Sequence, residues 1–150
     1  MKRINIYSLR QVKEKSGLYE LDTKRILSPD TAAEIIRKVL ELDQMDVEYF
    51  GILTLNNKNE VAGAHILGKG TINTVIATPR DIFKAALMNN AISVILFHNH
   101  PSGDPTPSPE DIQMTKRVEE AGQIIGIDVL DHIIIGHEGR FYSLKANGLI

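Results

Sequence analysis

The chain has no cysteine among its 150 residues, which excludes a disulfide framework, a thiolate metal site and a thiol nucleophile. It also has no apolar run near the roughly 20 residues that a membrane-spanning helix needs. Its first residues do not form a signal-peptide core, because polar side chains interrupt the short stretch Ile4-Asn5-Ile6-Tyr7. We therefore expect a cytoplasmic protein that does not associate with a membrane.

Charge of one sign is not in excess either. The net charge is −2, which gives no general argument for binding nucleic acid. The distribution is uneven, since residues 1–25 carry seven Lys and Arg against three Asp and Glu. We expect residues 1–27 to form an N-terminal extended arm, either as a basic arm or as a solvated polar hairpin. Binding of nucleic acid should be weak or absent.

Three stretches have the pattern of amphipathic helices, and each begins with a hydroxyl residue followed by proline. They are residues 28–42, 78–90 and 108–126, and their first residues are Ser28, Thr78 and Ser108. A Ser or Thr side chain caps a helix well, and proline suits the first helical position because its missing N–H has no partner there. These pairs therefore mark three helix starts.

Strand patterns alternate with these helices. Residues 48–56 and 60–70 predict a hairpin, 71–77 an extension of the sheet, and the unbroken apolar run 91–97 a fully buried strand. Residues 127–136 and 140–146 complete the sheet. The composition, 43% apolar and 24% charged, is that of a globular protein. We predict an α/β (α+β) fold, with residues 28–150 as a single domain whose central mixed sheet is flanked by helices.

Two of the five histidines stand at the end of the buried strand, as His98 and His100. Residues two apart in a strand point to the same side, so both imidazoles would face one spot and could hold a metal ion. A hydrolytic zinc site needs a third protein ligand, and the following loop offers Asp104, Glu110 and Asp111. Four prolines stiffen that loop, so an acid within it would be held in place.

The segment His98-x-His100-Pro101 followed by Ser108-x-x-Asp111 resembles the motif of the JAMM (MPN-plus) metalloproteases. Those proteins also carry an upstream glutamate in an E-x-x-G-aliphatic context, and Glu48 stands in such a context before Gly51. The stretches HNHPSGDPTPSPED and LDHIIIG are similar to the bacterial RadC-like branch of the family. The resemblance covers about residues 28–146.

The resemblance implies a function and a role for each matching residue. His98, His100 and Asp111 would bind Zn²⁺, Glu48 would be the general base that takes a proton from the attacking water, and Ser108 would stabilise the oxyanion. The reaction would be hydrolysis of a peptide or isopeptide bond in a peptide or protein substrate. The helix-hairpin-helix region usual in RadC-like proteins is expected to be absent, because only about 27 residues precede the matching part.

Each of these residues also has a structural interpretation. The two histidines would then be polar residues that cap a buried strand, and Glu48 a solvent-facing strand residue. Ser108 and Asp111 would be the N-cap and the third residue of a helix, where an acid completes a capping box and favours the helix dipole. With the whole motif present, we favour metal binding, and we favour the ligand role for Asp111.

The other histidines have weaker functional patterns. His65 alternates with apolar neighbours and is expected to be structural, and His137 is expected to be solvated. Asp131-His132 precedes an apolar run, so the pair either supports the metal site or is a polar strand start.

Two further function classes compete with a zinc hydrolase. One is a metal-binding DNA-processing or DNA-repair-associated protein, a nuclease or an accessory factor; the composition shows neither a basic groove nor a set of carboxylates for two metals. The other is a non-enzymatic binding module, which is disfavoured because all proposed ligands and the base are present. Zinc deaminases are excluded because they use cysteine ligands. No pattern in the sequence predicts the oligomeric state.

Overall fold

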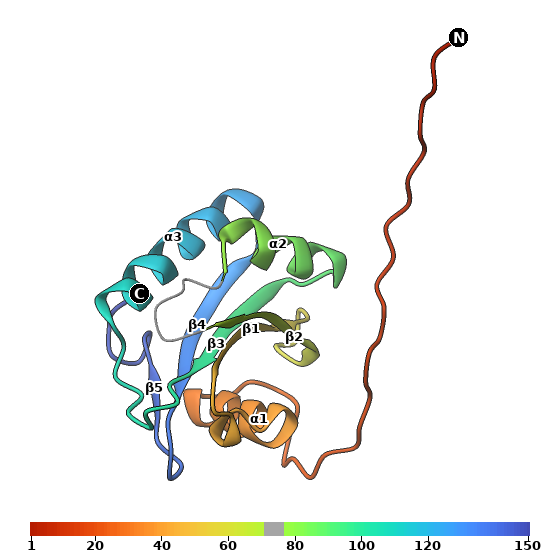
Figure 1. Cartoon of the computed structure of the whole chain (residues 1–150). Helices are drawn as coiled ribbons and strands as arrows, with labels where there is room; N and C mark the ends of the chain where they lie inside the picture. Colours follow the sequence, from red (N-terminus) through yellow and green to blue (C-terminus); the bar gives the residue numbers. More distant parts are fainter. Residues whose placement is uncertain (71–76) are drawn as a thin grey trace.

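The fold is a five-stranded mixed sheet with helices on both faces, seen in a computed structural model that describes residues 1–70 and 77–150 (Figure 1). The strand order is β2-β1-β3-β4-β5. Only the β3–β4 pair is parallel; the other three described pairs are antiparallel. The strands are β1 (Glu48–Leu55), β2 (Val61–Gly70), β3 (Ser93–Asn99), β4 (Asp128–Ile135) and β5 (Phe141–Ser143). This arrangement confirms the predicted fold class.

All three predicted helices form and begin where the sequence indicated. They are α1 (Pro29–Leu40), α2 (Pro79–Met88) and α3 (Pro109–Ile125), and a short 3-10 helix, η1 (Leu42–Gln44), follows α1. The capping side chains Ser28, Thr78 and Ser108 accept hydrogen bonds from the backbone N–H groups of Thr31, Asp81 and Asp111. Such a cap satisfies one of the four N–H groups that a helix start leaves unpaired.

The sheet separates two apolar cores. On one face, α1 packs Ala32, Ala33, Ile35 and Ile36 against alternate residues of β1, β3 and β4. On the other face, α2 and α3 cover a second cluster that includes Phe50, Ile52, Ile82, Phe83, Leu96 and Val118 (Figure 1). Because both faces are covered, the central strand β3 is buried over its whole length. This burial explains the unbroken apolar run that precedes His98.

Helix α3 connects the parallel strands β3 and β4, so the carboxyl end of β3 opens onto the loop that leads into α3. In sheets of this kind, ligands bind beyond the carboxyl ends of parallel strands. The topology thus brings the end of β3 and the first turn of α3 to one edge of the sheet.

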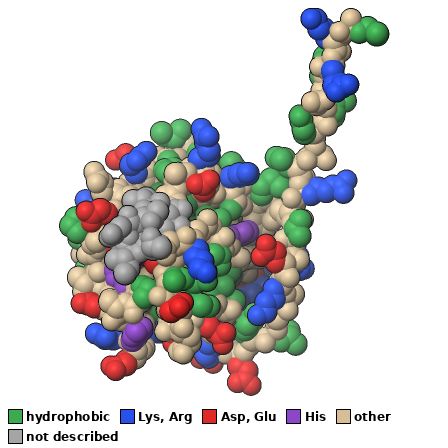
Figure 2. Space-filling model, in the orientation of Figure 1, with side chains coloured by type: hydrophobic (Ala, Val, Ile, Leu, Met, Phe, Trp, Pro, Cys, Tyr) green, Lys and Arg blue, Asp and Glu red, His purple; other side chains and the backbone are tan. Residues whose placement is uncertain are grey.

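The N-terminal arm is extended, and residues 1–21 form neither helix nor strand (Figure 1). No polar hairpin forms in residues 1–25; instead Arg25 forms an isolated antiparallel bridge with Glu60, next to β2. Basic and hydrophobic side chains follow one another along the projecting arm (Figure 2). Residues 71–76 of the predicted strand 71–77 lie outside the described residues. Among the described residues, no helix combines the length and the apolar character needed to cross a membrane.

We expect Gly51→Ala to destabilise the fold, because β1 has no room for a side chain at this position. A Cβ on Gly51 would lie 2.1 Å from the carbonyl oxygen of His65 and 2.5 Å from the ring of Phe97. Overpacking of this kind typically costs about 1–3 kcal/mol, and the upper end applies here because the nearest atom belongs to the backbone. Urea unfolding would measure the loss. Ala62→Val, at an exposed position of β2, is the control and should change stability by no more than about 0.5 kcal/mol.

Candidate metal centre

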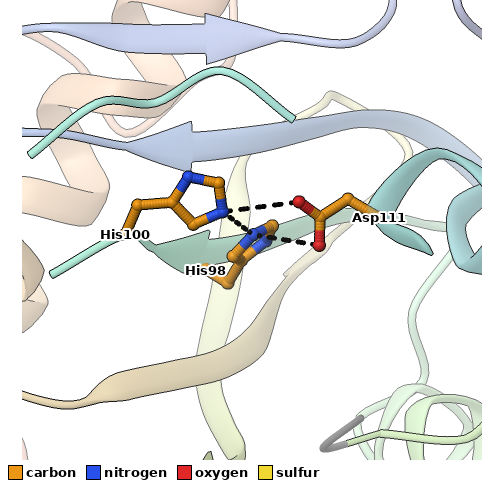
Figure 3. A group of neighbouring side chains, drawn as sticks. All are labelled: His98, His100 and Asp111. Atoms are coloured by element: carbon orange, nitrogen blue, oxygen red, sulfur yellow. Dashed lines mark hydrogen bonds and ion pairs between the residues drawn. The ribbon is translucent and has the colours of Figure 1, made fainter. Parts of the chain in front are cut away.

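Three side chains from the end of β3 and the start of α3 converge on one point: His98, His100 and Asp111 (Figure 3). Each offers one ligand atom, and these atoms all lie within 4.8 Å of one another. His98 belongs to β3 and His100 lies one residue beyond it, while Asp111 lies in the first turn of α3. The structure therefore brings together the three residues predicted as metal ligands.

The contacts within this cluster are short. The Nε2 atoms of His98 and His100 lie 2.9 Å apart. One carboxylate oxygen of Asp111 is 3.4 Å from Nε2 of His98, and the other is 3.4 Å from Nε2 of His100 (Figure 3). His98 is 1% exposed and His100 is half-buried. All four atoms thus face a common centre that is partly shielded from water.

Asp111 serves both the helix and the cluster. Its Oδ2 accepts a hydrogen bond of 2.8 Å from the backbone N–H of Ser108, and its own N–H donates to the Ser108 hydroxyl oxygen. The two carboxylate oxygens offer about four acceptor positions, so the capping box leaves the contacts with the histidines intact. The two interpretations of Asp111 are therefore compatible, and the capping box fixes the carboxylate in its orientation.

The charges of the cluster suit a cation. Burial alone would raise the pKa of Asp111, but the contacts with His100 and His98 outweigh it and hold that pKa well below its usual range. Asp111 is therefore an anion. Burial also acts to lower the pKa of His100, but the Asp111 carboxylate and the carbonyl group of Asp104 reverse this and raise it. The surroundings of His100 thus favour positive charge at this point.

A buried chain of hydrogen bonds fixes the ring of His98. Thr115 donates its hydroxyl hydrogen to the carbonyl oxygen of Asp111 over 2.6 Å, so it accepts from Nδ1–H of His132, also at 2.6 Å. Complete burial lowers the pKa of His132 well below its ordinary value, so that ring is neutral and its Nε2 is an acceptor. His98 then donates from Nδ1 to this Nε2 over 2.7 Å. The chain leaves the Nε2 lone pair of His98 for the cluster.

His100 is oriented by a simpler contact. Its Nδ1 lies 2.9 Å from the carbonyl oxygen of Asp104, and a carbonyl oxygen can only accept. Nδ1 therefore carries a proton, and when the ring is neutral its Nε2 offers a lone pair toward His98. At 2.9 Å, the two Nε2 atoms are close enough to share one cation, either a proton or a metal ion. Two imidazole nitrogens and one carboxylate are the donor set of a zinc site with three protein ligands, so these residues fit a zinc ion.

Glu48 lies beside the cluster and outside it. It begins β1, and its Oε1 is 4.0 Å from Nε2 of His98. Its side chain is 28% exposed, so water reaches it. Ser108 accepts the N–H of Asp111 at its hydroxyl oxygen, which leaves its hydroxyl hydrogen free to donate. Both residues predicted to act in catalysis thus lie next to the predicted ligands.

The other acids of the loop are directed elsewhere. The carboxylate of Asp104 accepts hydrogen bonds from the N–H and the hydroxyl group of Thr106, and Glu110 is exposed. Gly103 adopts a left-handed conformation with φ of +91°, which turns the loop. The ring of His137 packs against this glycine, and the backbone N–H of His137 donates to the Gly103 carbonyl oxygen. His137 is therefore half-buried and not freely solvated as expected.

Asp131 and His132 point to opposite faces of β4 and make contacts with different parts of the structure. His132 supports His98, as one of the two predictions for this pair had it. Asp131 instead accepts hydrogen bonds from the hydroxyl group of Ser143 and from the backbone N–H of Lys145, so it ties β4 to the turn after β5. His65 is structural as predicted, with its Nε2 3.1 Å from Oδ1 of Asn89.

Thr115 is a member of the site that sequence reasoning missed. A threonine in the second turn of a helix has no distinctive pattern, and its importance arises only when α3 packs on β4. The spacing of four residues from Asp111 was the available signal, because a helical Thr hydroxyl often bonds the carbonyl oxygen four residues earlier.

The family follows from comparison with known proteins. The model of the RadC-like JAB domain matches residues 26–149. A UPF0758 protein of Desulforamulus reducens is 56% identical over 110 residues, which are 73% of this chain and 48% of that protein. A UPF0758 protein of Clostridium beijerinckii is 48% identical over 126 residues, 84% of this chain and 54% of that protein. The chain belongs to the RadC-like JAB-domain family. It spans about half the length of these relatives.

We expect His132→Phe to weaken metal binding without unfolding the protein. The substitution keeps an aromatic ring at this place but removes the acceptor that orients His98. Loss of such a supporting partner typically costs 10–100-fold in metal affinity. Competition with a chromophoric chelator would measure the zinc dissociation constant. His65→Phe, which changes a histidine outside the cluster, should leave that constant unchanged. Equal affinity of the His132→Phe and wild-type proteins would contradict the proposed hydrogen-bond chain.

Proposed function

We propose that this protein is a zinc-dependent hydrolase of the JAMM type, which cleaves a peptide or isopeptide bond. One observation carries the proposal: two imidazole Nε2 atoms and the Asp111 carboxylate face one centre, and a further carboxylate, that of Glu48, lies 4.0 Å from one of the imidazoles. Three ligands with a separate base beside them are the arrangement of a hydrolytic zinc site with an open position for water. Membership of the JAB-domain family supports the same conclusion.

The protein's own residues have distinct tasks in this reaction. A bound zinc ion supplies Lewis acidity and lowers the pKa of a water molecule to about 7. Glu48 takes the proton of the attacking water and later delivers it to the leaving amine, as a general base that becomes a general acid. Ser108 donates its hydroxyl hydrogen to the oxygen of the former carbonyl group, where negative charge develops. His98, His100 and Asp111 hold the centre in place.

The first test concerns the metal. Protein purified without added metal should contain about one equivalent of zinc, and the double variant His98→Ala/His100→Ala should contain almost none, because two of its three ligands are missing. Elemental mass spectrometry gives the stoichiometry. A wild-type protein with less than about a tenth of an equivalent, which zinc addition does not restore, would show that this is not a zinc site.

The second test separates metal binding from catalysis. Glu48→Gln keeps the shape of the side chain and removes the base, so zinc content should stay near one equivalent while hydrolysis falls by roughly 10²–10⁴-fold. The assay would use a peptide library and isopeptide-linked fusions. Glu110→Gln is the matched control, since it removes a nearby exposed carboxylate and should retain the wild-type rate. If Glu48→Gln cleaved every wild-type substrate at the wild-type rate, the base would lie elsewhere.

Two further variants distinguish a ligand from an oxyanion donor. Asp111→Asn replaces an anionic ligand with a neutral amide, so it should lower zinc affinity together with the rate. Ser108→Ala should keep zinc and lose on the order of 10²–10³-fold in rate through weaker oxyanion stabilisation. It should also lose about 1 kcal/mol of stability, because it removes the N-cap of α3. Zinc loss in Ser108→Ala, with stability unchanged, would contradict this division of roles.

A further inference from the structure

The residue between the two histidines, Asn99, points to the opposite face of the sheet and is 2% exposed. Its side-chain amide makes two hydrogen bonds to the segment that leads into β1. Oδ1 accepts from the backbone N–H of Tyr49 over 2.7 Å, and Nδ2 donates to the carbonyl oxygen of Val47 over 2.9 Å. These two bonds engage the residues immediately before and after Glu48.

The two bonds continue the sheet where the backbone pairing between β1 and β3 ends. The antiparallel ladder between β1 and β3 runs as far as the pair Phe50 and His98. The next backbone pair would join Tyr49 and Asn99, but the chain leaves the ladder here, and the N–H of His100 donates to Ile135 on the other side of β3. The side-chain amide of Asn99 makes the hydrogen bonds that a paired backbone would make, because it carries one acceptor and one donor group as a peptide unit does.

This contact fixes the side to which Glu48 points. Side chains alternate along a strand, so holding Val47 and Tyr49 from the face that α1 covers directs Glu48 to the face of His98. In agreement, Tyr49 packs with the core under α1, and the Glu48 carboxylate lies beside His98. On its other edge the start of β1 is paired with β2, through Glu48 with Gly70 and Tyr49 with Lys69, so the Asn99 amide supplies the contact on the β3 side.

We propose that Asn99 is a positioning residue, which acts through Glu48 by fixing the backbone on both sides of it. The proposal rests on the function proposed above, since it assigns a partner to the general base of that site. The metal ligands do not depend on Asn99, because His98 is held by His132 and His100 by the carbonyl group of Asp104. Removal of the amide should thus displace the base and leave the metal.

The decisive variant is Asn99→Leu, which is similar in size and lacks both hydrogen-bonding groups. Asn99→Asp keeps an acceptor for the Tyr49 N–H but sets an oxygen against the carbonyl oxygen of Val47, so it should give an intermediate effect. The matched control is Asn56→Leu at the other end of β1. Asn56 also bonds two backbone groups, the N–H groups of Lys58 and Glu60, but it lies far along the strand from Glu48.

Three measurements test the proposal. Amide hydrogen exchange by NMR should be faster at Tyr49 in Asn99→Leu, on the order of tenfold as expected for one lost hydrogen bond, and unchanged at Ile52. Zinc content should stay near one equivalent. The kcat of Asn99→Leu should fall toward that of Glu48→Gln with KM unchanged, and adding Asn99→Leu to Glu48→Gln should cost nothing further, because both changes remove the same base. Asn56→Leu should match the wild type in all three.

The outcomes separate this proposal from the proposed function. Unchanged exchange at Tyr49, loss of zinc from Asn99→Leu, or a double variant with fully additive losses would each overturn the role of Asn99. A wild-type protein that binds zinc and cleaves no substrate would contradict the hydrolase. In that case, faster exchange at Tyr49 with zinc retained would still support the hold of Asn99 on the Glu48 segment.

Discussion

The close approach of the His98 and His100 Nε2 atoms, 2.9 Å apart, is the constraint around which this part of the fold is built. Each ring carries a proton on Nδ1, and each of those protons has a fixed acceptor. One acceptor is a buried histidine on β4 and the other is a carbonyl group of the loop. The parallel pairing of β3 with β4 is therefore a requirement of the site, because it sets His132 beside His98.

The start of α3 contributes the third side chain that contacts these two Nε2 atoms, that of Asp111. Ser108 and Asp111 close a capping box, and this box aims the carboxylate at the two imidazoles. Thr115, one turn further, then returns to the Asp111 carbonyl oxygen and links α3 to His132. Two of the predicted ligands, His98 and Asp111, are thus connected through protein groups. A site prepared in this way needs little rearrangement to bind a metal.

The sequence was sufficient to predict those parts that depend on local chemistry. A Ser or Thr followed by proline predicted the start of each of the three helices, and the apolar run predicted the buried strand. The H-x-H spacing and the family resemblance predicted the three residues that the structure brings together, although their role as metal ligands and the roles of Glu48 and Ser108 stay predictions. Tertiary contacts were not predictable in this way. Thr115 has no distinctive neighbours in sequence, and Asp131 was paired with His132 because the two are adjacent, whereas strand alternation sends them to opposite faces.

Strand alternation also explains why three adjacent residues can serve one site without competing. The side chain of His98 lies on the face of β3 that α2 and α3 cover, and that of Asn99 on the face that α1 covers. The backbone N–H of His100 continues the parallel ladder with β4 by donating to Ile135, while its ring turns back to His98. A shift of one residue in the pairing of β3 would exchange the two faces. It would place the Asn99 amide beside Asp111 and remove the His98 imidazole from the cluster. The register between β1 and β3, fixed by the apolar residues on both faces, therefore places the proposed metal site on one side of the strand and the Asn99 contacts with Val47 and Tyr49 on the other.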